Sequence, residues 1–142
     1  MNEIEDLLPH RAPFLFVDEI IEADREKIVA RHVFTENEFF FKGHFPGYPV
    51  VPGVILIEAM AQSGGAGLRK LGIIGDDSLF FLGSVDKVKF RRQVRPGDEV
   101  RSEIVNLRIS AKTIKQSGRA FVGEELAAEA EWLCLIGDVK KL

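Results

Sequence analysis

The sequence predicts an α+β fold in which an antiparallel β-sheet covers one long, buried α-helix. Two observations lead to this class. Residues Val54–Leu71 form a proline-free segment of 18 residues that is apolar almost all round, and several β-rich segments separated by short turns follow it. One buried helix followed by a run of strands is typical of α+β proteins, because each strand can bury one face against the helix.

The chain before the helix divides into two extended segments and a loop. Phe14–Glu22 is predicted to be a strand or extended segment, and Lys27–Phe34, which mixes β-branched and polar residues, a second strand. Glu36–Pro52 contains repeated prolines and glycines. Neither a helix nor a central strand tolerates that spacing, so the segment is predicted to be a loop.

The helix is expected to begin just after Pro52 and Gly53, which are residues typical of a helix start. A helix without a polar face is a buried helix. Three glycines, Gly64, Gly65 and Gly67, lower the helix propensity of its second half. We therefore expect that half to be distorted, and another backbone to approach it closely.

Four further strands are predicted after residue 77, and they alternate with the turns Pro96-Gly97-Asp98, Ser110-Ala111 and Gly123-Glu124. Their ranges are Leu79–Phe90, Glu99–Ile109, Lys112–Val122 and Leu126–Ile136. One small sheet cannot hide such a helix completely. We therefore expect a dimer in which two sheets join edge to edge.

The bulk properties predict one cytoplasmic domain over residues 1–142. A net charge of −3 gives no reason to expect nucleic acid or an anionic membrane as a partner. The single cysteine, Cys134, rules out a disulfide within the chain and favours a reducing compartment. Met1–Pro9 lacks the features of a signal peptide, and the apolar stretch Val50–Ala61 is too short and too interrupted to span a bilayer.

Glu58 and Gln62 are the first candidate functional residues. Glu58 lies in the most apolar part of the chain, and a carboxylate buried there without a partner costs several kcal/mol. It is therefore either paired or has a raised pKa, and a raised pKa suits a general acid. Gln62 lies four residues on, on the same helix face, where its amide can bind the carboxyl group. A purely structural carboxylate remains the alternative.

His44 and Gly53 are the other candidates at this end of the helix. His44 lies in the proline- and glycine-rich loop, and histidine is the usual side chain for moving protons near neutral pH. Gly53 offers an unpaired backbone N–H at the helix N-terminus, which can polarise a carbonyl group. We interpret His10 and His32 as structural or solvated. No histidine has the spacing of a zinc ligand, so no metal site is predicted.

A basic segment begins within the predicted strand Leu79–Phe90 and continues beyond its end. Lys87, Lys89 and Arg91 alternate, so they are expected to share one face of a strand, and Arg92 and Arg95 follow. Most such runs are solvated surface. The functional alternative is a basic patch that suits an acidic protein partner.

Several blocks of the sequence form a recognisable series. The blocks are Leu8–Phe14, Phe40–Pro46, Pro52–Val54, Glu58–Gln62, Asp86–Arg92 and Val94–Asp98. Together they resemble the FabZ-type (3R)-hydroxyacyl-acyl-carrier-protein dehydratases over almost the whole chain. They occur in the order found in that family, which makes the resemblance far more specific than any single block.

The resemblance implies a hot-dog fold, an antiparallel sheet wrapped around a central helix, and a homodimer that assembles further as a trimer of dimers. His44 matches the catalytic base and Glu58 the catalytic acid, contributed by different subunits. Gly53 matches the backbone donor to the thioester carbonyl, and Gln62 the residue that orients the acid. Phe81 stands where many members have a tyrosine thought to gate the acyl tunnel.

The implied reaction converts (3R)-hydroxyacyl thioesters, carried on the 4'-phosphopantetheine of acyl carrier protein, into trans-2-enoyl thioesters during fatty acid biosynthesis. It needs no metal and no redox cofactor. The basic residues would then contact the carrier protein. Three alternatives stay open: a dehydratase of a specialised polyketide or polyene pathway, a hot-dog thioesterase, and a non-catalytic protein that binds acyl carriers. Chain length, and carrier protein versus coenzyme A, are not predicted.

Overall fold

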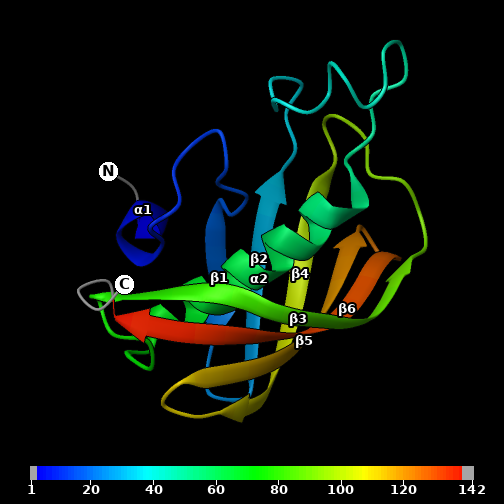
Figure 1. The fold of residues 1–142 in the computed structure, drawn as a ribbon. Coiled ribbons are helices and arrows are strands. Elements are labelled where there is room, and N and C mark those ends of the chain that lie inside the picture. The colour runs from blue at the N-terminus through cyan, green and yellow to red at the C-terminus, as the bar shows by residue number, and fades with distance from the viewer. Residues whose placement is uncertain (1–2, 139–142) are drawn as a thin grey trace.

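The computed structural model describes residues 3–138 and contains two helices and six strands within them. Figure 1 shows the longer helix lying across the sheet. The elements in chain order are α1 Glu3–Leu7, β1 Glu19–Ala23, β2 Lys27–Val33, α2 Gly53–Lys70, β3 Ser78–Phe90, β4 Glu99–Ile109, β5 Thr113–Val122 and β6 Glu125–Asp138.

The six strands form one sheet in the order β1-β2-β4-β5-β6-β3, and every neighbouring pair is antiparallel. Helix α2 packs on this sheet, and its apolar residues form the main core together with the inward-facing residues of the strands. The predicted α+β class, with an antiparallel sheet around one long helix, is confirmed. Residues 1–2 and 139–142 of the predicted 1–142 domain lie outside the described part of the chain.

Helix α2 is regular over its whole length, so the expected distortion of its glycine-rich half is wrong. Its glycines face side chains and not another backbone. A Cβ on Gly64 would lie 2.2 Å from Gln116, and one on Gly65 would lie 2.2 Å from Phe80. A Cβ on Gly67 would likewise lie 2.6 Å from Ile28. Close packing of these neighbours thus stabilises a helix whose propensity alone is weak.

Helix α1 is a feature that sequence patterning did not predict. Its Ile4 is buried in a small second core with Leu8 and Ile20, and Glu3 forms an ion pair of 2.6 Å with Lys70 at the end of α2. These contacts hold the N-terminal segment against the back of the helix. Strand β1 begins only at Glu19, later than the expected start at residue 14.

Strand β3 is an edge of the sheet and exposes large apolar side chains, among them Phe81 at 47% and Phe90 at 53%. A β-bulge lies between Asp86 and Lys89, and Lys87 adopts a left-handed conformation with φ of 53°. The regular alternation assumed for the basic residues is therefore wrong, because an extra residue in a bulge re-aims the side chains around it.

The loop between β2 and α2 extends beyond the end of the sheet and returns to the N-terminus of α2 (Figure 1). His44, Val51 and Pro52 of this loop therefore lie near the N-terminus of α2. Within residues 3–138, no helix combines the length and the apolar character needed to cross a bilayer.

Candidate active site

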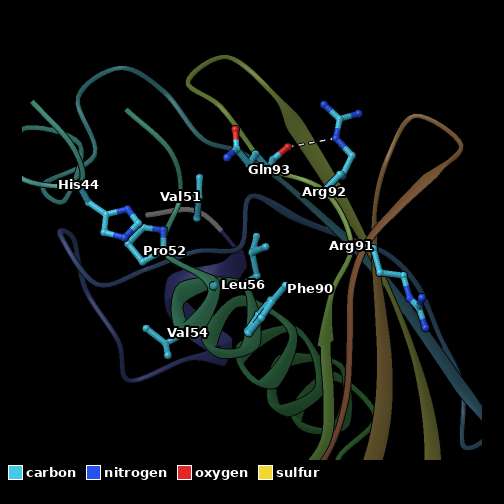
Figure 2. A pocket seen from close by; sticks show the side chains of 10 residues that line it. His44, Val51, Pro52, Val54, Leu56, Phe90, Arg91, Arg92 and Gln93 are labelled. Carbon is cyan, nitrogen blue, oxygen red and sulfur yellow. Dashed lines mark hydrogen bonds between the residues drawn. The ribbon is translucent and has the colours of Figure 1, made fainter. Parts of the chain in front are cut away.

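A cleft of about 630 Å³ opens at the N-terminus of α2. Figure 2 shows its side chains gathered around the first turn of the helix, with Arg91 and Arg92 pointing away from His44. The lining residues are His44, Val51, Pro52, Gly53, Val54, Leu56, Phe90, Arg91, Arg92 and Gln93.

The backbone fixes the ring of His44. Its Nδ1 lies 3.0 Å from the carbonyl oxygen of Val50, and the Val50 N–H in turn donates to the His44 carbonyl oxygen at 2.9 Å. A carbonyl oxygen can only accept, so Nδ1 carries the hydrogen of this bond. In the neutral ring, Nε2 then carries the free lone pair. His44 is thus oriented as a base.

Gly53, the first residue of α2, is packed under an aromatic ring. A Cβ at this position would lie 2.7 Å from the ring of Phe90, so a larger residue would have to displace that ring. The first turn of a helix presents N–H groups without intrahelical partners and the positive end of the helix dipole. Gly53 and His44 therefore border the same cleft, beside a site suited to a carbonyl oxygen.

Glu58 lies in a different cavity of about 330 Å³. Apart from His10, Glu58 and Gln62, this cavity is largely apolar, and Phe81, the expected gate residue, is part of its wall. The lining residues are His10, Phe14, Glu58, Ala61, Gln62, Phe80, Phe81, Leu82 and Cys134.

Gln62 is fully buried, and its amide has one possible orientation. Its Oε1 accepts a hydrogen bond of 2.8 Å from the N–H of Phe16, and its Nε2 donates to the carbonyl oxygen of Phe14 at 3.2 Å. The same Nε2 donates to Oε2 of Glu58 at 2.9 Å. The hydrogen bond expected from the four-residue spacing is therefore present, and the N-terminal segment determines its direction.

Burial raises the pKa of Glu58, and the hydrogen bond from Gln62 opposes that rise. The pKa rises overall, because removal of water from the charged form outweighs one amide donor. The carboxyl group thus keeps its proton to a higher pH than an ordinary glutamate. This is the property a general acid needs.

His10 is a residue of this cavity that sequence reasoning missed. Its Nε2 lies 3.6 Å from Oε2 of Glu58, a contact that the interpretation of His10 as structural or solvated did not include. Burial, followed by the charges of Arg69 and Arg11, lowers its pKa. No helical or strand periodicity connects position 10 with position 58, and only the folded N-terminal segment brings them together.

His32 occupies a different environment, beside the rings of Phe16 and Phe34. It is buried, its Nδ1 lies 2.8 Å from Oδ1 of Asp18, and its Nε2 lies 3.5 Å from Oε1 of Glu38. Burial acts to lower the pKa of His32, but the hydrogen bonds and charges of the two carboxylates outweigh it and raise the pKa to about 9. Through Asp18 and Glu38, His32 links β2 to the segment before β1 and to the loop that carries His44.

The basic residues predicted as a partner surface are largely paired within the chain. Lys87 lies 3.5 Å from Glu131, and Arg91 lies 3.0 Å from Glu129. Arg92 contacts Asp98 and Glu125 at 3.8 and 3.5 Å. Among the residues that the structure describes, the side chains of Lys89 and Arg95 form no ion pair with a carboxylate. The guanidinium of Arg95 lies 4.3 Å from the ring centroid of Tyr48.

Within residues 3–138, no three or more histidine, cysteine, aspartate or glutamate side chains come together in a group that could hold a metal ion.

Comparison with solved structures identifies the fold. A chain of the dehydratase heterocomplex ApeI:P from Xenorhabdus doucetiae superposes with a TM-score of 0.85 at 17% identity, covering 99% of this chain and 94% of that one. An uncharacterized protein from Pyrococcus horikoshii gives a TM-score of 0.65 at 16% identity, covering 95% of this chain and 94% of that one. At these identities the likeness concerns the fold alone, and the predicted hot-dog fold is confirmed.

Comparison of sequences identifies the family. Residues 8–131 match the model of the FabA-like domain. The chain is 49% identical to the 3-hydroxyacyl-acyl-carrier-protein dehydratase FabZ of Desulforamulus reducens, over 96% of each chain. It is 47% identical to the enzyme of the same name from Pelotomaculum thermopropionicum, over 92% of this chain and 94% of the relative. The chain therefore belongs to the FabZ family of 3-hydroxyacyl-acyl-carrier-protein dehydratases, which are hydro-lyases built on a FabA-like domain.

Proposed function

We propose that the protein dehydrates (3R)-hydroxyacyl-acyl-carrier protein to trans-2-enoyl-acyl-carrier protein in fatty acid biosynthesis, with His44 as base and Glu58 as acid. The observation that carries this assignment is the state of Glu58. Its carboxyl group has a raised pKa in an apolar cavity and is oriented by Gln62, so it can hold a proton and deliver it. The names of the relatives supply the substrate class.

In the proposed reaction the thioester carbonyl accepts a hydrogen bond from the N–H of Gly53, which acidifies C2. Nε2 of His44 removes a proton from C2, and the electron pair of that C–H bond forms the C2–C3 double bond. Glu58 transfers its proton to the 3-hydroxyl group as the C3–O bond breaks, so water leaves. His44 ends as imidazolium and Glu58 as carboxylate, and the excess proton returns from His44 to Glu58 through solvent.

We further propose that the active site is shared between two protomers. Within one chain, His44 and Glu58 line separate cavities at successive turns of α2. The long, apolar edge strand β3 supports this arrangement, because an exposed apolar edge is a template for pairing with another chain. A homodimer joined at β3, extended to a trimer of dimers, would bring one protomer's His44 to the Glu58 of its partner.

We assign the acyl chain to the Glu58 cavity, whose walls include Phe14, Phe80 and Phe81. Phe81 would act there as an apolar gate without a hydroxyl group. Among the basic residues, Lys89 and Arg95 are the best candidates for contacting the phosphopantetheine or the acidic carrier, because no carboxylate in residues 3–138 neutralises them. We also propose that residues 1–142 form one domain, supported by the single sheet, and that the enzyme is cytoplasmic.

The test combines one assay with two substitutions. The purified protein is incubated with a 3-hydroxyacyl thioester of acyl carrier protein, and enoyl absorbance and free thiol are followed together. We expect enoyl formation, and a loss of kcat of about a thousandfold or more in His44→Ala and in Glu58→Gln.

Three outcomes would contradict the proposal. Release of free thiol without an enoyl product would identify a thioesterase. Activity that survives both substitutions would remove His44 and Glu58 from the chemistry. Binding of acyl carrier protein with neither product would identify a non-catalytic carrier-binding protein.

A further inference from the structure

The two oxygens of the Glu58 carboxyl group have different surroundings. Oε2 accepts the hydrogen bond from Gln62 and has Nε2 of His10 at 3.6 Å, slightly beyond hydrogen-bond distance. Oε1 makes no hydrogen bond within residues 3–138. A protonated carboxyl group places its hydrogen on the oxygen that is not already accepting bonds. The proton therefore belongs on Oε1, the oxygen left free for a substrate.

The tautomer of His10 follows from its other nitrogen. Nδ1 is buried and has no hydrogen-bond partner in the described part of the chain. A buried N–H without a partner costs more than a buried lone pair at a weakly basic nitrogen, so the hydrogen of the neutral ring belongs on Nε2. This places an N–H donor opposite Oε2 of Glu58.

We propose that His10 is a positioning residue for Glu58: its Nε2–H and the amide of Gln62 together hold Oε2, keep the transferable proton on Oε1, and stabilise the carboxylate that forms when the proton leaves. This inference rests on the proposed role of Glu58 as the acid. The 3.6 Å separation shortens as charge develops on the carboxyl group, because a charged acceptor draws in its donors.

His10 acts in this way only while it is neutral, and its surroundings keep it so. The titratable and charged groups that face this contact are Arg11 from the N-terminal segment, Arg69 from α2 and the Cys134 thiol from β6. Burial and the two arginines lower the pKa of His10. Strand β3 contributes the apolar side chains of Phe80, Phe81 and Leu82. A cation at His10 would instead turn Glu58 into a permanent carboxylate.

The N-terminal segment holds His10 in place. Arg11 donates to the carbonyl oxygens of Leu8 and His10 at 2.8 and 2.7 Å and to that of Glu5 at 3.0 Å. Leu8 is buried in the second core, and the His10 ring lies 5.9 Å from that of Phe80. The imidazole thus reaches Glu58 from a segment that is anchored independently of the catalytic residues.

Two matched variants with side chains of different length test the contact between His10 and Glu58. In His10→Gln the amide nitrogen can occupy the position of Nε2, whereas in His10→Asn it falls short. We expect kcat of His10→Asn to fall roughly tenfold, with KM changed less than about twofold, because the lost bond acts in the transition state. We expect His10→Gln to retain kcat within about threefold.

The pH profile separates positioning from folding. Activity requires protonated Glu58, so kcat falls as pH rises through its pKa. Loss of a donor to Oε2 disfavours the carboxylate, so this alkaline limb should move to higher pH in His10→Asn, by up to about one unit, and return in His10→Gln. Leu8→Ala serves as the control, since it loosens the same segment without removing a group at Glu58. It should lower the melting temperature and leave the limb in place.

An unshifted limb in His10→Asn, or an equal shift in Leu8→Ala, would overturn the inference. The two hypotheses fail differently. If Glu58→Gln keeps its activity, the proposed acid is wrong. If Glu58→Gln is inactive while both His10 variants match the wild-type profile, only the role of His10 is wrong.

Discussion

Two histidines in residues 3–138, His32 and His10, lie beside carboxyl groups, and their pKa values are shifted in opposite directions. His32 lies 2.8 Å from Asp18 and has a pKa of about 9, so the ring is a cation at neutral pH. His10 lies 3.6 Å from Glu58, and there the histidine pKa is lowered while the carboxyl pKa is raised. The first contact is an ion pair, whereas at the second both pKa shifts favour the neutral forms.

The surrounding charges explain the difference. His32 faces two carboxylates, whose combined attraction outweighs its burial. His10 faces one carboxyl group and two arginines, Arg69 and Arg11, which oppose a second positive charge. Desolvation acts in the same sense on both histidines. The sign of the neighbouring charges therefore decides the role of a histidine–carboxyl contact. With neighbouring carboxylates it becomes an ion pair that stabilises the fold, and with neighbouring arginines the carboxyl group can keep a proton for transfer.

The largest expected effect comes from making the Glu58 site resemble the His32 site. Gln62→Glu places a second carboxyl group beside His10 and removes the donor to Glu58 and to Phe14. We expect the pKa of His10 to rise and kcat to fall by about a hundredfold or more, since the acid loses its orienting bond. Steady-state kinetics across pH 6–9 measure this.

The matched control is Ser63→Ala on the same helix. Within the described residues, the Ser63 hydroxyl donates to the carbonyl oxygen of Ala59, at 2.7 Å, and to no other group. Its removal should therefore leave kcat within about twofold. A Gln62→Glu enzyme as active as the Ser63→Ala enzyme would mean that carboxyl orientation does not limit the reaction.

The His32 ion pair should make stability depend on pH. The folded pKa of about 9 lies above the ordinary value of 6.5, so the stabilisation is complete below about pH 6.5 and is lost as pH rises through 9. We expect the free energy of unfolding to fall by about 3 kcal/mol over this interval. Urea titrations at several pH values measure it. In Asp18→Asn the fall should largely disappear, and an unchanged slope would assign the effect to other groups.

Glu38 is the weaker partner, and its removal should have a smaller effect. Its Oε1 lies 3.5 Å from Nε2 of His32, whereas Asp18 makes a close hydrogen bond. We expect Glu38→Gln to reduce the pH-dependent loss of stability by about 1 kcal/mol. Equal effects of Asp18→Asn and Glu38→Gln in the same titrations would show that the two carboxylates act as one unit.

The smallest predicted effect is a change in the reactivity of Cys134, the single cysteine of the sequence, that depends on the charge of Glu58. Burial, and then the charge of Glu58, raise the pKa of Cys134 to about 12. In Glu58→Gln the charge is absent, so the thiol should ionise more readily and alkylation by iodoacetamide at pH 9 should accelerate by about threefold. Mass spectrometry follows the modification. Equal rates in the two proteins would mean that Glu58 stays neutral at that pH.

The sequence predicted most of the fold because its signals are local. Pro52 and Gly53 marked the helix start to within one residue, and β4 was predicted with its observed bounds Glu99–Ile109. The missed helix Glu3–Leu7 is only 5 residues long and depends on tertiary contacts, such as that between Glu3 and Lys70, which no periodicity encodes.

The candidate site was predictable in part for the same reason. The bond between Gln62 and Glu58 follows from a spacing of four residues on one helix. His10 approaches Glu58 across 48 positions, so only the folded chain reveals it. The bulge near Lys87 was also missed, because alternation assumes an uninterrupted strand.

The glycines of α2 have a consequence for protein engineering. Replacing a helical glycine with alanine is a routine way to raise stability, worth up to about 1 kcal/mol on an exposed helix. At Gly64, Gly65 and Gly67 the added methyl group would meet Gln116, Phe80 or Ile28 at 2.2 to 2.6 Å. A library that samples alanine there would be depleted of folded clones, and thermostabilising designs for this scaffold should leave all three positions fixed and draw their substitutions from its exposed turns.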